Sequence, residues 1–316
     1  MLVLTRADVE ELLDLDALVD ALAQAHRALS AREVSMPARG ITFAERDGLL
    51  GTMPAYVPGS GLAVKLVTLF PHNRDRHTHQ AAIMVFDHEN GTPLALMDGT
   101  SITALRTAAG SALATRLLAR EDARVLAILG TGVQARSHVR ALTRVRDFAV
   151  VRVAGRDRRK AEAVAEEVGG TSAASFEEAV RGADVVAATT HSDEPVVRRE
   201  WLAPGTHVNS VGLNARGREV DEATVADALV VVESRDAALA PLPSGAPELQ
   251  ERGDRIHAEL GELVAGRRPG RSSPEEITLY RSVGVAVQDA AAAALVLRAA
   301  RDRERGLKIE LEELTQ

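Results

Sequence analysis

The stretch Arg124–Ala135 reads RVLAILGTGVQA, and the rest of the chain is organised around it. Its first part, Val125–Leu129, is an unbroken apolar run, which is typical of a strand buried on both faces of a parallel sheet. The pattern G-x-G-x-x-A follows and predicts a tight turn that opens a helix. Gly130 permits the turn, Gly132 lets backbone N–H groups approach a pyrophosphate, and Ala135 lets the helix pack closely on its strand. The stretch therefore predicts a dinucleotide-binding unit.

Strand-like and helical segments alternate after this turn, which favours a doubly wound parallel sheet with right-handed crossovers. Helices are predicted at Val133–Val145, Arg158–Val168 (with Asp157 as its cap), Ser175–Arg181 and within the charged segment Gly245–Gly270. Strands are predicted at Phe148–Ala154, Asp184–Thr190, His207–Val211, Leu229–Glu233 and Ile277–Val283. The fold class is therefore α/β, with a Rossmann sheet.

The N-terminal third has a different pattern. Helices are predicted within Val9–Ala31 and at Ile102–Ala119, with strands at Met36–Phe43, Gly48–Tyr56, Leu62–Phe70, Ala81–His88 and Pro93–Asp98. Asn90-Gly91 between the last two strands is a hairpin signal. The Ala-rich helix Val285–Arg301 is assigned to this part, and the charged tail Glu304–Gln316 is expected to be frayed or docked on the surface. We therefore expect a discontinuous α+β domain of residues 1–119 plus 285–316, and a dinucleotide-binding domain of residues 120–284.

Composition sets broader bounds. The 316 residues are 46% hydrophobic and 26% charged, with a net charge of −7 and no cysteine. Such a chain is expected to be globular and cytoplasmic, with no nucleic-acid or membrane partner. Disulfides and Cys-ligated metals are excluded. The nine histidines show no H-x-x-x-H or H-E-x-x-H spacing, so no catalytic metal is predicted.

Seven short motifs, in order along nearly the whole chain from Arg39 to about Asp289, resemble the ornithine cyclodeaminase/mu-crystallin family. They are Gly51–Tyr56 (GTMPAY), Lys65–Thr68 (KLVT), His79–Ala81 (HQA), Met97–Gly99 (MDG), Ile102–Ala109 (ITALRTAA), Gly130–Ala135 (GTGVQA) and Ser282–Gly284 (SVG). The resemblance implies a homodimer formed through the N-terminal sheets, and a cleft in which a small imino or amino acid meets a nicotinamide.

Three cations of the first domain stand among apolar or small residues rather than in charged runs: Arg39, Lys65 and Arg106. A buried cation needs an anionic partner, and arginine offers a planar fork for a carboxylate. Together with the family motifs, this predicts that Arg39 and Arg106 bind a substrate carboxylate while Lys65 contacts the reacting centre. For any one of these residues taken alone, an ordinary surface cation or a structural ion pair is the favoured interpretation.

Two positions bear on the reaction. The cyclodeaminase branch of the family has a glutamate at the position of Gly51 and an aspartate at that of Asn214, whereas mu-crystallin has glycine at the first. Neither Gly51 nor Asn214 can act as a base, so the chain resembles the mu-crystallin/ketimine reductase branch more closely. Lys65 and His79 are the candidate proton donors, and Met53 and Asn214 are further candidate substrate contacts.

The expected reaction is reduction of a cyclic ketimine, such as Δ1-pyrroline-2-carboxylate or Δ1-piperideine-2-carboxylate, to the L-amino acid. One alternative is an ornithine/lysine cyclodeaminase or an alanine-type dehydrogenase that uses bound NAD. Another is a low-turnover protein that binds NADP(H) and a ligand. The three retained cations argue against the binding protein.

The end of the second Rossmann strand indicates which cofactor binds. NAD enzymes place an acidic residue there, and an arginine nearby accommodates the 2′-phosphate of NADP. Gly155 occupies that position and Arg156 follows, which favours NADP(H), although Asp157 argues the other way and NAD(H) is an alternative. The other predicted cofactor contacts are Thr107, Gly130, Thr131, Gly132, Val133, Gln134, Thr189, Val211 and Gly212. Asp289, in a block that the family shares, is expected to hold the domain interface rather than to take part in chemistry.

Overall fold

The computed structural model describes residues 1–214 and 217–310, which form two compact units. The first unit contains residues 1–106 and the chain from Val285 onward, and the second contains Thr107–Gly284. The division lies inside the helix α3 (Gly99–Leu118), whereas the sequence placed it after residue 119. The amino-acid composition of a continuous helix does not change at the point where the helix passes from one unit to the next, so the sequence does not mark this boundary.

The first unit is built on a seven-stranded sheet. Its order is β15-β1-β6-β5-β4-β3-β2. Strands β2 to β6 form an antiparallel meander, and β1 pairs parallel with β6. The bounds are β1 Leu2–Leu4, β2 Gly40–Phe43, β3 Leu49–Val57, β4 Gly61–Leu69, β5 His79–Phe86, β6 Pro93–Asp98 and β15 Leu307–Lys308.

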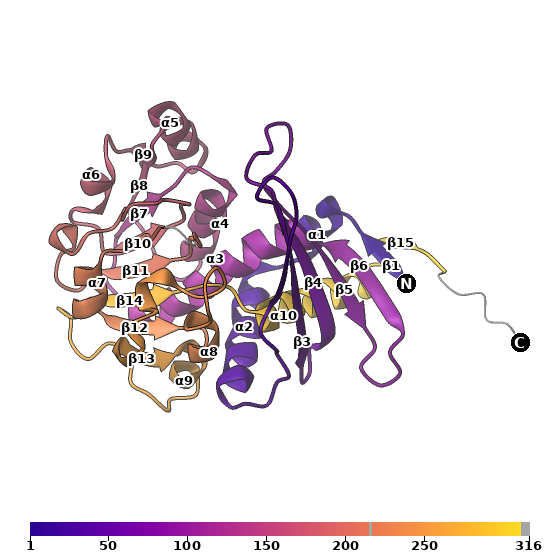
Figure 1. The fold of residues 1–316 in the computed structure, drawn as a ribbon. Helices are drawn as coiled ribbons and strands as arrows, with labels where there is room; N and C mark the ends of the chain where they lie inside the picture. The colour runs from indigo at the N-terminus through magenta and orange to yellow at the C-terminus, as the bar shows by residue number, and fades with distance from the viewer. Residues whose placement is uncertain (215–216, 311–316) are drawn as a thin grey trace, which may run out of the picture. The chain divides into compact units, whose positions relative to one another are not determined.

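Three helices belong wholly to this unit: α1 (Arg6–Leu12), α2 (Leu15–Ser30) and α10 (Ala286–Asp302). Thr5 and Asp14 cap the first two through side-chain hydrogen bonds, as expected for helix N-termini. Helix α10 packs along β3, β4 and β5, and α2 packs on α10 (Figure 1). One face of the sheet is therefore covered, and side chains alternate between this buried face and a partly exposed one.

The second unit contains an eight-stranded sheet in which every pairing is parallel. Its order is β13-β12-β14-β11-β10-β7-β8-β9. The bounds are β7 Val125–Leu129, β8 Val150–Ala154, β9 Thr171–Ser172, β10 Val185–Ala188, β11 His207–Ser210, β12 Leu229–Val232, β13 Ile256–Glu259 and β14 Thr278–Arg281. The strand order reverses between β7 and β10, which is the switch point where doubly wound sheets bind ligands. The Rossmann prediction is confirmed.

Helices connect these strands. They are α4 (Val133–Leu142), α5 (Arg158–Glu167), α6 (Phe176–Val180), α7 (Glu222–Asp227), α8 (Arg235–Ala238) and α9 (Leu260–Val264), with three 3₁₀ turns at Arg199–Trp201, Pro247–Leu249 and Gly253–Arg255. Asp157 caps α5 by accepting a hydrogen bond from Lys160 N, as the sequence predicted. No helix in the described ranges is long and apolar enough to cross a membrane.

Three segments differ from their sequence-based predictions. Met36–Arg39 is not a strand, because only Gly40–Phe43 pairs with β3. Gly245–Gly270 is largely irregular and contains β13 as well as the short helix α9. The tail adds a strand, β15, which pairs with β1. Tertiary pairing overrides local patterning in all three; residues 311–316 lie outside the described part of the chain.

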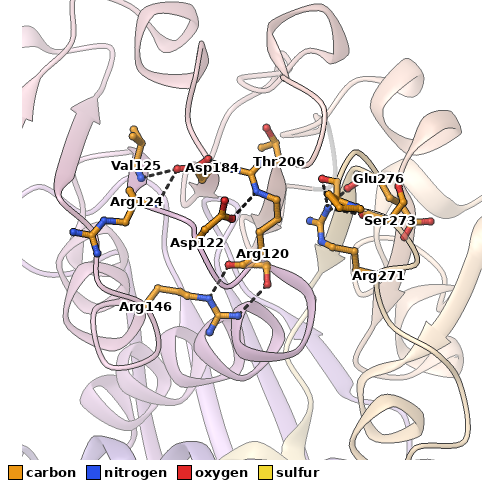
Figure 2. A network of polar contacts seen from close by, with 12 residues as sticks. Arg120, Asp122, Arg124, Val125, Arg146, Asp184, Thr206, Arg271, Ser273 and Glu276 are labelled. Atoms are coloured by element: carbon orange, nitrogen blue, oxygen red, sulfur yellow. Dashed lines mark hydrogen bonds and ion pairs between the residues drawn. The ribbon is translucent and has the colours of Figure 1, made fainter.

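A polar network lies at the amino-terminal edge of the parallel sheet (Figure 2). Asp184, just before β10, accepts hydrogen bonds from Arg124 N (2.8 Å), Val125 N (2.9 Å) and the Arg120 guanidinium (2.5 Å). Arg146 donates to the carbonyl oxygens of Ala119 (2.9 Å) and Arg120 (3.0 Å), next to the end of α3. Because ligands bind at the opposite, carboxyl edge of such sheets, this network is structural.

Candidate functional site

Lys65 lies in the middle of the first unit's sheet. In the register of the sheet it stands beside Met53 on β3 and Ile83 on β5, on the face that α10 covers. The side chain is 2% exposed, and its Nζ lies 2.7 Å from Oδ2 of Asp289 on α10. A buried ammonium requires such a partner, so the sheet and helix together hold this lysine.

Arg106, at the end of the first unit's part of α3, shares the same carboxylate. Its Nε donates to Asp289 Oδ1 (3.0 Å), and its Nη1 donates to Gln288 Oε1 (2.9 Å). Within the described chain, Nη2 has no hydrogen-bond acceptor. Arg106 is 5% exposed, and its guanidinium is fixed at two points, which leaves one edge of its fork for another acceptor.

The cluster of Lys65, Arg106 and Asp289 carries more positive than negative charge, since two buried cations share one carboxylate. Burial lowers the pKa of Lys65 to about 8; Asp289 opposes this shift, whereas Arg106 and Arg39 add to it. Burial alone would raise the pKa of Asp289, but the two cations outweigh it and hold that pKa below its ordinary value. This arrangement favours an anionic ligand.

The other predicted residues of the first unit surround this cluster. Arg39 is partly buried and acts electrostatically on Lys65. Met53 is 6% exposed and stands directly beside Lys65. Burial, followed by Lys65 and Arg106, lowers the pKa of His79 to about 4. The predicted cations and His79 are therefore brought together, and Asp289 joins them within the first unit.

The glycine turn of the second unit has the geometry that a pyrophosphate needs. Gly130 has φ +126°, and a Cβ there would meet Thr189 Oγ1 at 2.6 Å. At Gly132 a Cβ would meet nothing within 4 Å, and no side chain caps α4, which begins at Val133. Open space above an uncapped N-terminus of a ten-residue helix fits an anionic phosphate group.

The residues after β8 are those that the sequence predicted for the adenosine end of a dinucleotide site. Gly155 packs against Thr131, because a Cβ there would meet Thr131 Cγ2 at 2.6 Å. Arg156 is exposed and makes no hydrogen bond or ion pair within the described residues. Asp157 is used as the cap of α5. An arginine without a partner is therefore available at the position that distinguishes NADP from NAD.

The ends of β10 and β11 are joined by one buried carboxylate that sequence reasoning missed. Glu219 is 2% exposed and accepts from the backbone N–H of Thr190 (2.6 Å) and Gly212 (2.7 Å). It also accepts from the hydroxyls of Thr190 (2.7 Å) and Ser210 (2.9 Å). Glu219 thus fixes the segment that carries Thr189, Val211 and Gly212.

Other predicted contacts have structural partners. Asn214 Nδ2 donates to Asp193 Oδ1 (2.8 Å) and Ser192 O (3.2 Å), so it fastens a neighbouring loop. Thr107 is 7% exposed within α3, and the backbone oxygen of Gln134 accepts a hydrogen bond from His138 Nδ1 (2.8 Å). The roles of these three residues toward a ligand stay predictions.

Gln288 and His26 were also missed by sequence reasoning. Both are fully buried, and their side-chain Nε2 atoms lie 3.0 Å apart. A single polar residue on an apolar helix face gives no sign of its function before its neighbours are known. The only sequence signal near Gln288 was the neighbouring Asp289, which lies in a block of residues that the family shares.

Comparisons with known proteins agree with this architecture. The family model described as "Ornithine cyclodeaminase/mu-crystallin family" matches residues 1–304, and the chain belongs to this family. Ketimine reductase mu-crystallin of Mus musculus is 43% identical over 270 residues, which are 83% of this chain and 84% of that protein.

Two solved structures resemble the whole chain. The Δ1-pyrroline-2-carboxylate reductase of Thermococcus litoralis, in complex with NADH and L-proline, has a TM-score of 0.93 at 36% identity and covers 98% of this chain and 100% of its own. An archaeal alanine dehydrogenase dimer with bound NAD has a TM-score of 0.91 at 33% identity and covers 99% of both chains.

Proposed function

We propose that this protein reduces a cyclic ketimine, such as Δ1-pyrroline-2-carboxylate or Δ1-piperideine-2-carboxylate, to the corresponding L-amino acid, using a reduced nicotinamide dinucleotide. The observation that carries the proposal is the buried cluster in which Lys65 and Arg106 share the single carboxylate of Asp289. A carboxylate substrate supplies the negative charge that this cluster lacks. Two relatives, the ketimine reductase mu-crystallin and the Δ1-pyrroline-2-carboxylate reductase, support the same chemistry.

Each cation has a role in this reaction. Arg106 binds the substrate carboxylate through its open edge, with Arg39 as a second contact, and Met53 lines the same face. Lys65 donates a proton to the imine nitrogen: its pKa of about 8 keeps it protonated at neutral pH, yet allows it to release the proton. A reduced nicotinamide cofactor, when bound, would supply the hydride for the imine carbon, so that one hydride and one proton convert C=N to CH–NH.

His79 has a different role from Lys65. Because burial and the neighbouring cations lower its pKa to about 4, the imidazole is neutral at neutral pH. A neutral imidazole donates or accepts a hydrogen bond but does not act as a strong acid. We therefore assign the proton transfer to Lys65 and an orienting hydrogen bond to His79.

We infer that the second unit is the dinucleotide-binding domain and that it prefers NADPH. Its glycine turn and the N-terminus of α4 hold the pyrophosphate, while Glu219 fixes Thr189, Val211 and Gly212 beneath the nicotinamide half. Arg156, which has no partner in the described chain, is available for a 2′-phosphate. We also propose a cytoplasmic location, because the proposed reaction consumes reduced nicotinamide dinucleotide and the cytoplasm supplies it.

We further propose that the first unit forms a homodimer through the uncovered face of its sheet. Leu50 is 38% and Leu66 41% exposed, and the register places apolar side chains around them. These are Pro54, Tyr56, Leu62, Val64, Met84, Phe86 and Leu96. An apolar sheet face of this extent favours a partner surface, and a second copy of the chain offers the same face. The alanine dehydrogenase relative is a dimer.

Gly51 argues against the cyclodeaminase and ammonia-using alternatives. It lies on the covered face of β3, and a Cβ there would meet Val67 Cγ1 at 3.0 Å. A glutamate therefore fits only if Val67 moves. Without a carboxylate here, the cluster of Lys65, Arg106 and Asp289 has no carboxylate base besides Asp289, whose oxygens are already engaged by two cations.

The test is turnover by the purified protein. NADPH and NADH are each incubated with either cyclic imino acid, and loss of the reduced nicotinamide's absorbance is followed. We expect imine-dependent oxidation of NADPH, and an Arg106→Lys variant with a KM for the imino acid raised about tenfold or more, because lysine lacks the planar fork. Ammonia release from L-ornithine with NAD, without imine reduction, would contradict the proposal.

A further inference from the structure

A fully buried histidine stands behind the carboxylate-binding arginine. His26 lies on α2, and its Nε2 is 3.0 Å from Nε2 of Gln288 on α10. Gln288 is also fully buried, and its Oε1 accepts the hydrogen bond from Arg106 Nη1 at 2.9 Å. Three side chains from three helices thus form a continuous chain that ends at the guanidinium.

The direction of these hydrogen bonds is determined by their chemistry. The amide nitrogen of Gln288 can only donate, so His26 Nε2 must be the unprotonated ring nitrogen that accepts. The same amide then presents its oxygen to Arg106. In the reversed orientation the amide N–H groups would face the cation, which can only donate, so Arg106 fixes which way the Gln288 amide points. His26 Nε2 then accepts from the other end of the amide and holds it in place.

The guanidinium needs both of its anchors. Asp289 Oδ1 holds Nε at 3.0 Å, but a single hydrogen bond allows the plane of Arg106 to pivot about it. The second anchor, at Nη1, stops this rotation and leaves the Nη2 edge in one direction. Recognition of a carboxylate by an arginine depends on that planar geometry.

We propose that His26 is a positioning residue for substrate binding: acting through Gln288, it fixes the orientation in which Arg106 meets the substrate carboxylate. This inference rests on the proposed function, in which Arg106 binds that carboxylate. His26 itself contacts neither substrate nor cofactor. It acts on binding of the imino acid and not on binding of the dinucleotide.

The experiment replaces His26 in the full-length protein and separates the kinetic constants. His26→Phe keeps a ring of similar size but removes the acceptor, and we expect the KM for the imino acid to rise about tenfold, as for one lost hydrogen bond. We expect kcat to change less and the Kd for NADPH, measured by its fluorescence, to be unchanged. His26→Asn retains a carbonyl acceptor and should recover part of the loss.

Leu22→Ala is the matched control. Leu22 is also fully buried on α2, but its apolar side chain forms no hydrogen bond to Gln288, so this variant should lower the melting temperature while leaving the KM for the imino acid unchanged. The inference is overturned if His26→Phe leaves that KM unchanged, or if Leu22→Ala raises it equally. Failure of the proposed function gives a different result, because the unmodified protein would then show no imine-dependent oxidation of NADPH.

Discussion

At the scale of single residues, Lys65 shows how burial adjusts a common side chain for proton transfer. A solvated lysine holds its proton too firmly to act as an acid at neutral pH. Here removal from water lowers the pKa to about 8, and Asp289 prevents a larger fall. The same carboxylate holds Arg106, so the proton donor and the carboxylate-binding group keep a fixed spacing.

The pH dependence of turnover tests this role. The protonated form of Lys65 is the competent one, so kcat/KM for the imino acid should be constant below the pKa and fall as pH rises through about 8. Lys65→Arg keeps the charge but cannot release a proton, and kcat should fall by about 10² or more. A profile that is flat through this range in the unmodified protein would assign the proton to another group.

Arg156 permits a residue-scale test of cofactor preference. Arg156→Ala should raise the KM for NADPH about tenfold and leave that for NADH almost unchanged, because only NADPH has a 2′-phosphate. Arg158→Ala is the control: Arg158 is an exposed neighbour already paired with Glu162 at 2.9 Å. Equal losses with both cofactors would place Arg156 outside the phosphate site.

At the scale of elements, α3 shows how one helix is fixed at both ends of its length. The part of α3 that belongs to the first unit carries Arg106, and the carbonyl groups at the C-terminal end of the helix accept hydrogen bonds from arginines elsewhere in the second unit. Arg146 donates to Arg116 O (3.2 Å) and Ala119 O (2.9 Å), and Arg271 donates to Leu118 O (2.8 Å). The carbonyl groups at a helix C-terminus have no partners within the helix, and cations stabilise them.

Loss of this cap should be measurable as stability. We expect Arg146→Met, which keeps most of the apolar stem, to lower the free energy of unfolding by about 1–3 kcal/mol, because partly buried carbonyl groups lose their donors. The urea midpoint measures this change. Arg140→Met on the exposed side of α4 is the control and should change the midpoint little.

Elements also show where local patterning succeeds. Asn90-Gly91 correctly predicted the hairpin between β5 and β6, and Asp157 correctly predicted the start of α5. The strand Ile256–Glu259 was misread as helical because its four residues lie in a charged segment. Its identity comes from pairing with β12, which a local window does not contain.

At the scale of the whole molecule, two buried histidines link stability to pH. Burial lowers the pKa of His138 to about 4 and that of His207 to about 3. His207 lies 2.8 Å from Thr278 Oγ1, and His138 lies 2.9 Å from Ser111 Oγ. Both side chains are therefore neutral in the folded protein at neutral pH.

The sign of the effect follows from these shifts. Below the unfolded pKa of about 6.5, the unfolded chain binds protons that the folded chain does not, so stability falls as pH falls. It should go on falling toward the folded pKa values of about 4 and about 3. His207→Asn should show a smaller decrease in melting temperature between about pH 7 and about pH 5 than the unmodified protein. An unchanged slope would show that His207 does not contribute.

The assembly gives the second prediction at this scale. Leu66→Glu places a charge in the apolar sheet face, and we expect the variant to sediment as a monomer at concentrations where the unmodified protein is a dimer. Leu242→Glu, at a position 45% exposed in the second unit, should leave the dimer intact. A monomeric unmodified protein would contradict the proposed interface.

The sequence by itself determined the Rossmann unit, the motifs of the family and the three cations, because each depends on local pattern or on residues that stand out from an apolar background. Only the tertiary structure decided how those cations are held. Asp289 and Gln288 lie 183 and 182 residues from Arg106 along the chain, and His26 lies 262 residues from Gln288. Charge balance and hydrogen-bond direction in a buried site depend on such distant contacts, which folding alone brings together.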